Sequence, residues 1–182
     1  MLTVLAIVAI IAAAGIVIIL LLAAAKPDTF RIERTATIAA PADRIFPLIN
    51  DFRNWPSWSP WEKLDPAMTR TLSGAESGKG AVYAWKSAGK AGQGRMEIAQ
   101  ALPPSQIDID LDFHKPFKAH NVAEFRLEPQ GSSTKVTWAM RGKSPFAAKV
   151  MRTVVNMDKM VGKDFEAGLD NLRTLAEKSG PR

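Results

Sequence analysis

The hydrophobic pattern divides the chain at Lys26. Residues 2–25 carry no charged side chain, and only Thr3 and Gly15 interrupt an otherwise aliphatic run. As a helix this run would be about 37 Å long, compared with about 30 Å for the hydrocarbon core of a bilayer. We therefore predict that residues 1–25 form a single transmembrane anchor and that residues 26–182 form one domain of ordinary size.

A cleaved signal peptide is the alternative interpretation of this run, because the three alanines at 23–25 resemble a cleavage site. Two features argue against it: no Lys or Arg precedes the run, and the run exceeds the roughly 7–15 apolar residues of a signal core. Lys26, Arg31 and Arg34 follow the run closely, and the positive-inside tendency then places the domain in the cytoplasm. We thus expect a single-pass membrane protein.

Beyond Lys26, alternation of apolar and polar residues predicts β-strands. The clearest case is the segment 107–114, where four apolar residues alternate with three aspartates and a histidine. Short turns containing Gly or Pro separate most of the strands, which is typical of an antiparallel meander. The predicted strands cover residues 30–38, 68–73, 81–86, 94–101, 107–114, 118–128 and 134–141.

Two segments have a helical pattern. Residues 42–50 predict a short amphipathic helix. Between Pro145 and Lys178 apolar residues recur at steps of three and four, from Val150 and Val154 onward, which predicts one long helix with any break near Gly162. Its apolar stripe must lie on the apolar face of the sheet. The fold class is therefore α+β, with helices on one face of the sheet.

The segment 50–66, between the first helix and the meander, combines indole rings with helix-breaking residues. The prolines exclude a long regular helix there. So much aromatic surface in a broken segment must cover something apolar or be covered by it, so we interpret the segment as the rim or lid of a hydrophobic cavity. The tryptophans are Trp55, Trp58 and Trp61, and the prolines are Pro56, Pro60 and Pro66.

Several motifs together resemble the START/Bet v 1-like (SRPBCC) superfamily, in particular its polyketide cyclase/dehydrase and lipid-transport-like branch. The resemblance covers about residues 30–176. It implies a helix-grip fold, in which a curved antiparallel sheet wraps around a long C-terminal helix, and it implies that holding a hydrophobic small molecule is the usual activity. The motifs that carry it are residues 37–46, 50–61, 78–85, 94–96, 134–138 and 156–160.

Charge and composition narrow the possible partners. The chain has 24 Lys and Arg against 18 Asp and Glu, a modest excess of basic residues. This excess could indicate binding to nucleic acid or to an anionic membrane, and with an anchor attached the membrane is the simpler partner. A helix face that is merely solvated is a plainer interpretation than either partner. The absence of cysteine excludes disulfides, thiolate chemistry and cysteine metal sites. The densest basic residues are Arg141, Lys143, Lys149, Arg152, Lys159 and Lys163.

Motifs for catalysis or metal binding are missing from the sequence. His114 and His120 fall opposite the apolar residues of their strands and should face outward. Asp108, Asp110 and Asp112 should form a hydrated strip, with about 7 Å between neighbours, rather than a metal site. No phosphate-binding loop or nucleophile elbow is present. We predict no catalytic residue, cofactor or metal.

Polar residues on the apolar faces could orient a ligand in a cavity that is otherwise apolar. Tyr83 and Asn121 lie on such faces, and Asp158 interrupts the apolar side of the C-terminal helix. The structural alternative is that Tyr83 and Asn121 satisfy backbone groups and that Asp158 pairs with a nearby cation. The predicted ligand-binding residues are Trp55, Trp58, Trp61, Tyr83, Trp85, Met96, Phe113, Asn121, Phe125, Trp138, Met140 and Met157.

The function expected from these features is membrane-anchored binding of a hydrophobic small molecule or lipid between the sheet and the C-terminal helix. One alternative is a cyclase- or hydrolase-like enzyme, which requires at least two of Tyr83, Asn121 and Asp158 to converge on one cavity. Another is a module without ligand that binds a membrane or a protein through its basic helix. Apolar residues alone do not distinguish a cavity from a filled core.

Overall fold

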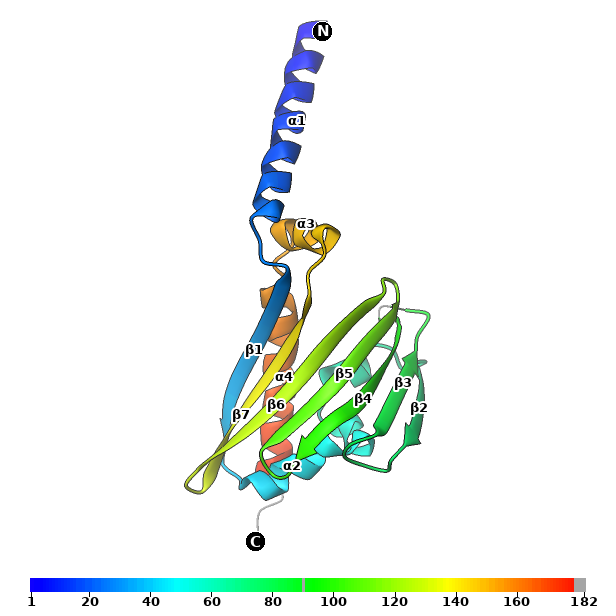
Figure 1. Ribbon diagram of the computed structural model, residues 1–182, viewed down its shortest axis with the longest axis vertical. Coiled ribbons are helices and arrows are strands. Elements are labelled where there is room, and N and C mark those ends of the chain that lie inside the picture. The colour runs from blue at the N-terminus through cyan, green and yellow to red at the C-terminus, as the bar shows by residue number, and fades with distance from the viewer. Residues whose placement is uncertain (90, 179–182) are drawn as a thin grey trace.

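One seven-stranded antiparallel sheet forms the body of the protein in this computed structural model, which describes residues 1–89 and 91–178 (Figure 1). The strand order β1-β7-β6-β5-β4-β3-β2 pairs the first strand with the last and leaves the others as consecutive hairpins. The predicted meander is confirmed, and every predicted strand ends within two residues of the observed bounds. The strands are β1 (Thr29–Ile38), β2 (Thr69–Gly74), β3 (Ala81–Lys86), β4 (Gln93–Leu102), β5 (Gln106–Lys115), β6 (Ala119–Gln130) and β7 (Ser133–Lys143).

Helices cover one face of this curved sheet, as a helix-grip fold requires. The helix α2 (Ala42–Asn50) and the short 3-10 helices η1 (Phe52–Ser57) and η2 (Pro60–Lys63) connect β1 to β2. The long helix α4 (Met157–Lys178) packs along β1 and buries one apolar stripe. The stripe consists of Phe165, Leu169, Leu172 and Ala176. Residues 179–182, which the predicted domain included, lie outside the described residues.

The single long C-terminal helix was predicted incorrectly. The structure has α3 (Phe146–Val154) and α4, separated at Val155 and Asn156. Val155 is extended, and the Asn156 side chain accepts a hydrogen bond from the Lys159 N–H at 2.9 Å, so Asn156 caps the start of α4. The turn between them sends α3 away from the sheet, and Val154, predicted to lie in the apolar stripe, is 68% exposed.

Gly162 does not break the helix but allows a close contact on its surface. A Cβ at this position would lie 2.0 Å from the guanidinium group of Arg34 on β1. Arg34 uses this space to form ion pairs with Asp158 at 3.0 Å and with Glu166 at 2.7 Å. These pairs connect the first strand to the first three turns of α4.

The helix α1 (Leu2–Ala24) projects away from the domain and touches it only near its C-terminal end, where α3 lies across it (Figure 1). It is long and apolar enough to cross a membrane, with a mean hydropathy of 3.3 over Thr3–Ala24, and Ala23 is its one buried residue among those whose burial is described. A signal sequence shares these properties, so the helix by itself suggests an anchor only weakly.

Basic residues of α3 hold the connection between α1 and β1. Lys149, predicted to be part of a solvated basic face, is instead 8% exposed and pairs with Asp28 at 2.6 Å. The Arg152 guanidinium lies 5.4 Å from the centre of the Phe30 ring and donates a hydrogen bond to the Ser144 hydroxyl. Part of the basic stretch is therefore structural.

Candidate functional site: an apolar cavity under the tryptophan segment

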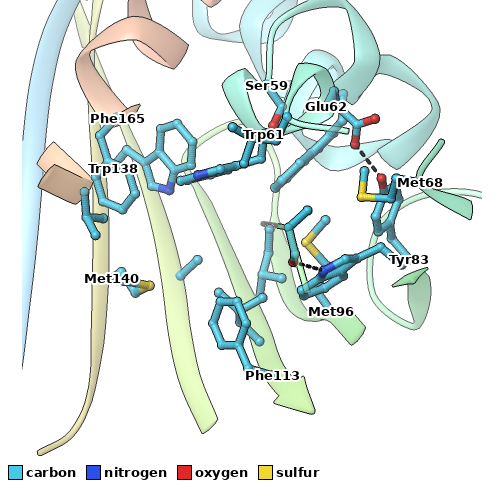
Figure 2. A pocket seen from close by; sticks show the side chains of 18 residues that line it. Ser59, Trp61, Glu62, Met68, Tyr83, Met96, Phe113, Trp138, Met140 and Phe165 are labelled. Carbon is cyan, nitrogen blue, oxygen red and sulfur yellow. Dashed lines mark hydrogen bonds between the residues drawn. The ribbon is translucent and has the colours of Figure 1, made fainter. Parts of the chain in front are cut away.

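A cavity of about 200 Å³ lies between the concave face of the sheet, the η1–η2 segment and the first turns of α4 (Figure 2). This volume far exceeds the roughly 10–15 Å³ that one water molecule requires. Figure 2 shows Trp138 and Phe165 on one side and Met68, Tyr83 and Met96 on the other. The walls are almost entirely apolar, so the space suits a hydrophobic molecule better than a charged one.

Most of the predicted ligand-binding residues line this cavity. The alternation of the strands places their side chains on its sheet wall, and the η1–η2 segment supplies the opposite wall. The role of these residues in binding remains a prediction, although their position is now established. The predicted residues that line the cavity are Trp55, Trp61, Tyr83, Trp85, Met96, Phe113, Trp138 and Met140.

Four predicted residues do not line the cavity. Trp58 and Phe125 are buried behind it, with ring centroids 5.6 Å and 4.9 Å from that of Trp138. Asn121 is buried beside Gly142 of β7. A Cβ added at Gly142 would lie 2.1 Å from the Oδ1 atom of Asn121. Met157 starts α4 and is half-buried outside the cavity wall. These side chains belong to the filled core or to its edge.

Sequence reasoning missed part of the lining. The alternation of β5 had already placed Ile109 and Leu111 on the apolar face, and the α4 stripe contained Phe165. No comparable signal existed for Ser59 and Glu62, because polar residues in a proline-rich segment are usually solvated. The other lining residues not predicted are Leu64, Met68, Ala91, Ala123 and Val161.

The tryptophan segment is a fixed wall rather than a loose lid. The indole N–H groups of Trp55 and Trp58 donate to the carbonyl oxygens of Ile49 and Leu48 on α2, at 3.0 Å and 2.9 Å. Both indoles are almost fully buried, so the predicted rim position is wrong for them. Trp61 is only half-buried and alone fits that description.

Trp138 is the centre of an aromatic stack that forms the closed side of the cavity. Its ring lies parallel to Phe165 with centroids 4.3 Å apart, and Trp61 meets it edge-on at 5.2 Å. Gly168 on α4 makes room for the indole, because a Cβ there would lie 2.6 Å from it. The Nε1–H of Trp138 is buried and has no hydrogen-bond partner among the described residues.

A second polar feature joins η2 to the sheet. The Tyr83 hydroxyl donates to Oε1 of Glu62 at 2.5 Å, and Nε of Arg70 donates to Oε2 of the same carboxylate at 2.5 Å. Burial, and then the hydrogen bond to Glu62 and the negative charge of this carboxylate, raise the pKa of Tyr83. The tyrosine therefore stays protonated, with its proton committed to Glu62.

The catalytic alternative required at least two of three polar residues to converge on one cavity, and they do not. Tyr83 lines the cavity, Asn121 does not, and Asp158 pairs with Arg34 on the exposed side of α4. The hydrogen bond from Arg34 lowers the pKa of Asp158. The catalytic site proposed from Tyr83, Asn121 and Asp158 is therefore wrong. For Asp158 the alternative, pairing with a nearby cation, is confirmed.

The acidic strip of β5 faces outward, as predicted. Asp108 pairs with Arg126 at 2.6 Å, and Asp112 contacts the exposed His120 at 2.7 Å. His114 is also exposed. Within residues 1–89 and 91–178, no three acidic, His or Cys side chains are placed to hold a metal ion.

Comparison with known proteins agrees with this architecture. Residues 29–177 match the model of the family described as polyketide cyclase/dehydrase and lipid transport. The chain belongs to this family. No curated protein matches it. Because the match spans the whole sheet and nearly all of α4, the family membership applies to the domain that contains the cavity.

Solved structures share the helix-grip fold at low sequence identity. Protein Ms6760 from Mycobacterium smegmatis is 19% identical, with a TM-score of 0.59 over 85% of this chain and 96% of its own. Ara h 8.0201 is 14% identical, with a TM-score of 0.54 over 83% and 99%. The di-domain ARO/CYC BexL of the BE-7585A biosynthetic pathway is 16% identical, with a TM-score of 0.64 over 88% of this chain and 53% of its own. At these identities the similarity shows the fold.

Proposed function

We propose that this protein holds a hydrophobic small molecule or lipid in the cavity beneath the tryptophan segment, in a domain anchored to a membrane by α1. The observation that carries the proposal is the cavity itself, with its aromatic and methionine walls. Methionine side chains adapt to ligands of different shape. The family description, which includes lipid transport, supports the same activity class.

The polar groups of the cavity would orient the ligand. Ser59 and Tyr83 line the cavity, and their hydroxyl groups are the neutral polar groups that a carbonyl or hydroxyl oxygen of the ligand could contact. A small number of such groups in an apolar pocket typically fixes the orientation of a ligand. We therefore expect an aromatic or acyl molecule that carries one or two neutral oxygen groups.

The anchor would place the cavity where apolar molecules accumulate. The largely exposed α1 supports this location, and the basic residues Lys26, Arg31 and Arg34 that follow it favour a cytoplasmic domain. Cleavage of α1 as a signal peptide is the competing outcome. Mass measurement of the full-length protein from its native membrane distinguishes the two.

A cavity-filling substitution tests the binding function. Ala123 lines the cavity, so Ala123→Leu should displace the ligand, whereas Ala101→Leu, on the neighbouring part of the sheet outside the lining, should not. The full-length protein is purified from membranes, and its organic extract is analysed by mass spectrometry. A molecule present in the wild type and Ala101→Leu but absent from Ala123→Leu is the expected result. Extracts without such a molecule, or with equal amounts in all three proteins, would contradict the proposal.

A cyclase-type reaction on the bound molecule is a second candidate, favoured by the buried Glu62 and Tyr83 pair and by the family description. It predicts that Tyr83→Phe retains an unconverted form of the same molecule. If the wild type and Tyr83→Phe carry the same compound, the pair only positions the ligand.

A further inference from the structure

The opening of the cavity lies at one end of the sheet. Met96 and Ile109 of the lining are buried, whereas Trp85, Phe113 and Met140 are half-buried. These three lie near the C-terminal ends of β3, β5 and β7. Alternate strands of an antiparallel meander end on the same side. The opening is therefore at the sheet end that carries the β3–β4 and β5–β6 turns.

The same end of the sheet carries α1. β7 leads into α3, which packs against α1, and Figure 1 shows both helices beyond the end at which β5 turns into β6. The β4–β5 and β6–β7 turns and the C-terminal end of α4 lie at the opposite end. An anchored domain of this shape has its cavity opening on the side of the bilayer.

Large apolar side chains are exposed at this end. Phe117, in the β5–β6 turn, is 76% exposed, and Met151 of α3 is 52% exposed. Phe146 of α3 and Met160 of α4 are half exposed as well. Single exposed apolar residues are common, but a group of them at the same end of the molecule is typical of an interaction surface.

Lysines accompany these apolar residues. Lys115 and Lys118 flank Phe117, Lys143 ends β7, and Lys159 lies in the first turn of α4. All four are exposed, and none forms an ion pair within the described part of the chain. Apolar side chains next to unpaired lysines are typical of surfaces that lie at the headgroup level of anionic bilayers.

We propose that the β5–β6 turn and α3 rest on the surface of an anionic bilayer, so that the cavity opens towards the lipid and exchanges its ligand directly with it. This proposal rests on the proposed function, because it requires α1 to be the anchor. The bilayer is favoured as the occupant because the apolar α1 ends beside α3 and the four lysines at this end have no ion-pair partner among the described residues, whereas Asp28, Asp112 and Asp158 are each paired. Binding of this surface to a second copy of the chain or to another protein is an alternative that the test can detect.

A fluorescent label can report whether the turn contacts lipid. The chain has no cysteine, so Phe117→Cys introduces a single labelling site, and Leu102→Cys in the strand at the opposite end provides a matched exposed control. Full-length protein with the fluorophore NBD is reconstituted into vesicles of phosphatidylcholine and phosphatidylglycerol. We expect nitroxide-labelled lipids to quench NBD at position 117 at least about twofold more than at position 102.

The outcomes separate the two proposals. If the protein resists carbonate extraction from the vesicles but both labels are equally unquenched, the anchor stands and the membrane-facing surface is wrong. If the protein does not stay with the vesicles, the anchor fails and this proposal fails with it. A disulfide-linked dimer of Phe117→Cys, formed in place of lipid quenching, would assign the surface to a second copy and overturn the proposal.

Charge reversal tests the lipid class. Lys118→Glu reverses a lysine of the proposed surface, whereas Lys79→Glu reverses an exposed lysine in the β2–β3 turn at the opposite end. In the Phe117→Cys background, Lys118→Glu should reduce the extra quenching gained with phosphatidylglycerol by about half, and Lys79→Glu should leave it unchanged. Equal quenching in vesicles of phosphatidylcholine alone would contradict the anionic part of the proposal.

Discussion

The concave face of the sheet has a filled half and an open half, although both are built from similar residues. In the filled half, Phe125 and Trp138 are at most 1% exposed; Trp138 packs against Phe165 of the α4 stripe, and Phe125 packs against Trp58. In the open half, Phe113 and Met140 face the cavity and are half-buried. Apolar residues on a sheet face therefore do not decide whether the space above them is filled.

The difference lies in what covers each half. The helix α4 covers the filled half, but it begins only at Met157 because Asn156 caps it there. The residues that a continuous helix would have placed over the sheet form α3, which lies against α1 instead. The break thus sends these residues to α1, and the half-buried Phe113 and Met140 lie at the ends of β5 and β7 where the cavity opens.

Truncation of a large side chain should distinguish the two halves most strongly. Phe125→Ala in the filled half should lower the free energy of unfolding by about 3–5 kcal/mol, because it removes a fully buried ring and leaves a void. Met140→Ala in the open half should cost about 1 kcal/mol, because its side chain borders empty space already. Urea denaturation of the full-length protein in detergent, followed by tryptophan fluorescence, measures both. Equal losses would mean that the cavity is filled in solution.

Two glycines of α4 offer a finer test of the filled half. Gly168→Ala forces a Cβ against the rigid Trp138 indole and should destabilise the protein by about 1–3 kcal/mol. Gly162→Ala meets only the flexible end of Arg34, and the better helix propensity of alanine, worth about 1 kcal/mol, should offset the disturbed ion pairs. The same denaturation assay compares them. A larger loss for Gly162→Ala would show that the Arg34 contacts matter more than the aromatic stack.

The sheet could be predicted from the sequence because alternation is a local property. The β5 segment shows this best, since its aspartates and its apolar residues occupy opposite faces as the pattern requires. The same alternation also predicted part of the cavity wall, because it placed Tyr83, Met96 and Phe113 on the apolar face of the sheet.

The remaining features depend on contacts that no local pattern encodes. The periodicity of residues 145–178 runs through the break between α3 and α4, and only the Asn156 cap marks the boundary. The division between cavity residues such as Met140 and core residues such as Phe125 depends on which element lies above each strand. The burial of Glu62 depends on two partners, Arg70 and Tyr83, that follow it in the sequence.

The smallest expected effect concerns the polar edge of the open half. Tyr83 is the single tyrosine of the chain, so tyrosinate absorbance reports it directly. Burial and the Glu62 carboxylate raise its pKa in the folded state, so the folded protein should show no tyrosinate absorbance as the pH passes the ordinary value near 10. The protein unfolded in urea should titrate near that value. Tyr83→Phe, which should give no signal in either state, is the control.

The direction of this pKa shift also fixes a pH dependence of stability. Because the folded state holds the Tyr83 proton more tightly, the stabilisation is complete below a pH of about 10 and is lost as the pH rises above it. At neutral pH, Tyr83→Phe should cost about 1 kcal/mol, because the hydrogen bond to Glu62 is lost while the carboxylate keeps Arg70. The difference between the two proteins should then shrink above pH 10. A folded-state titration of Tyr83 at its ordinary pKa would show that solvent reaches this part of the cavity and that the open half is more open than the structure indicates.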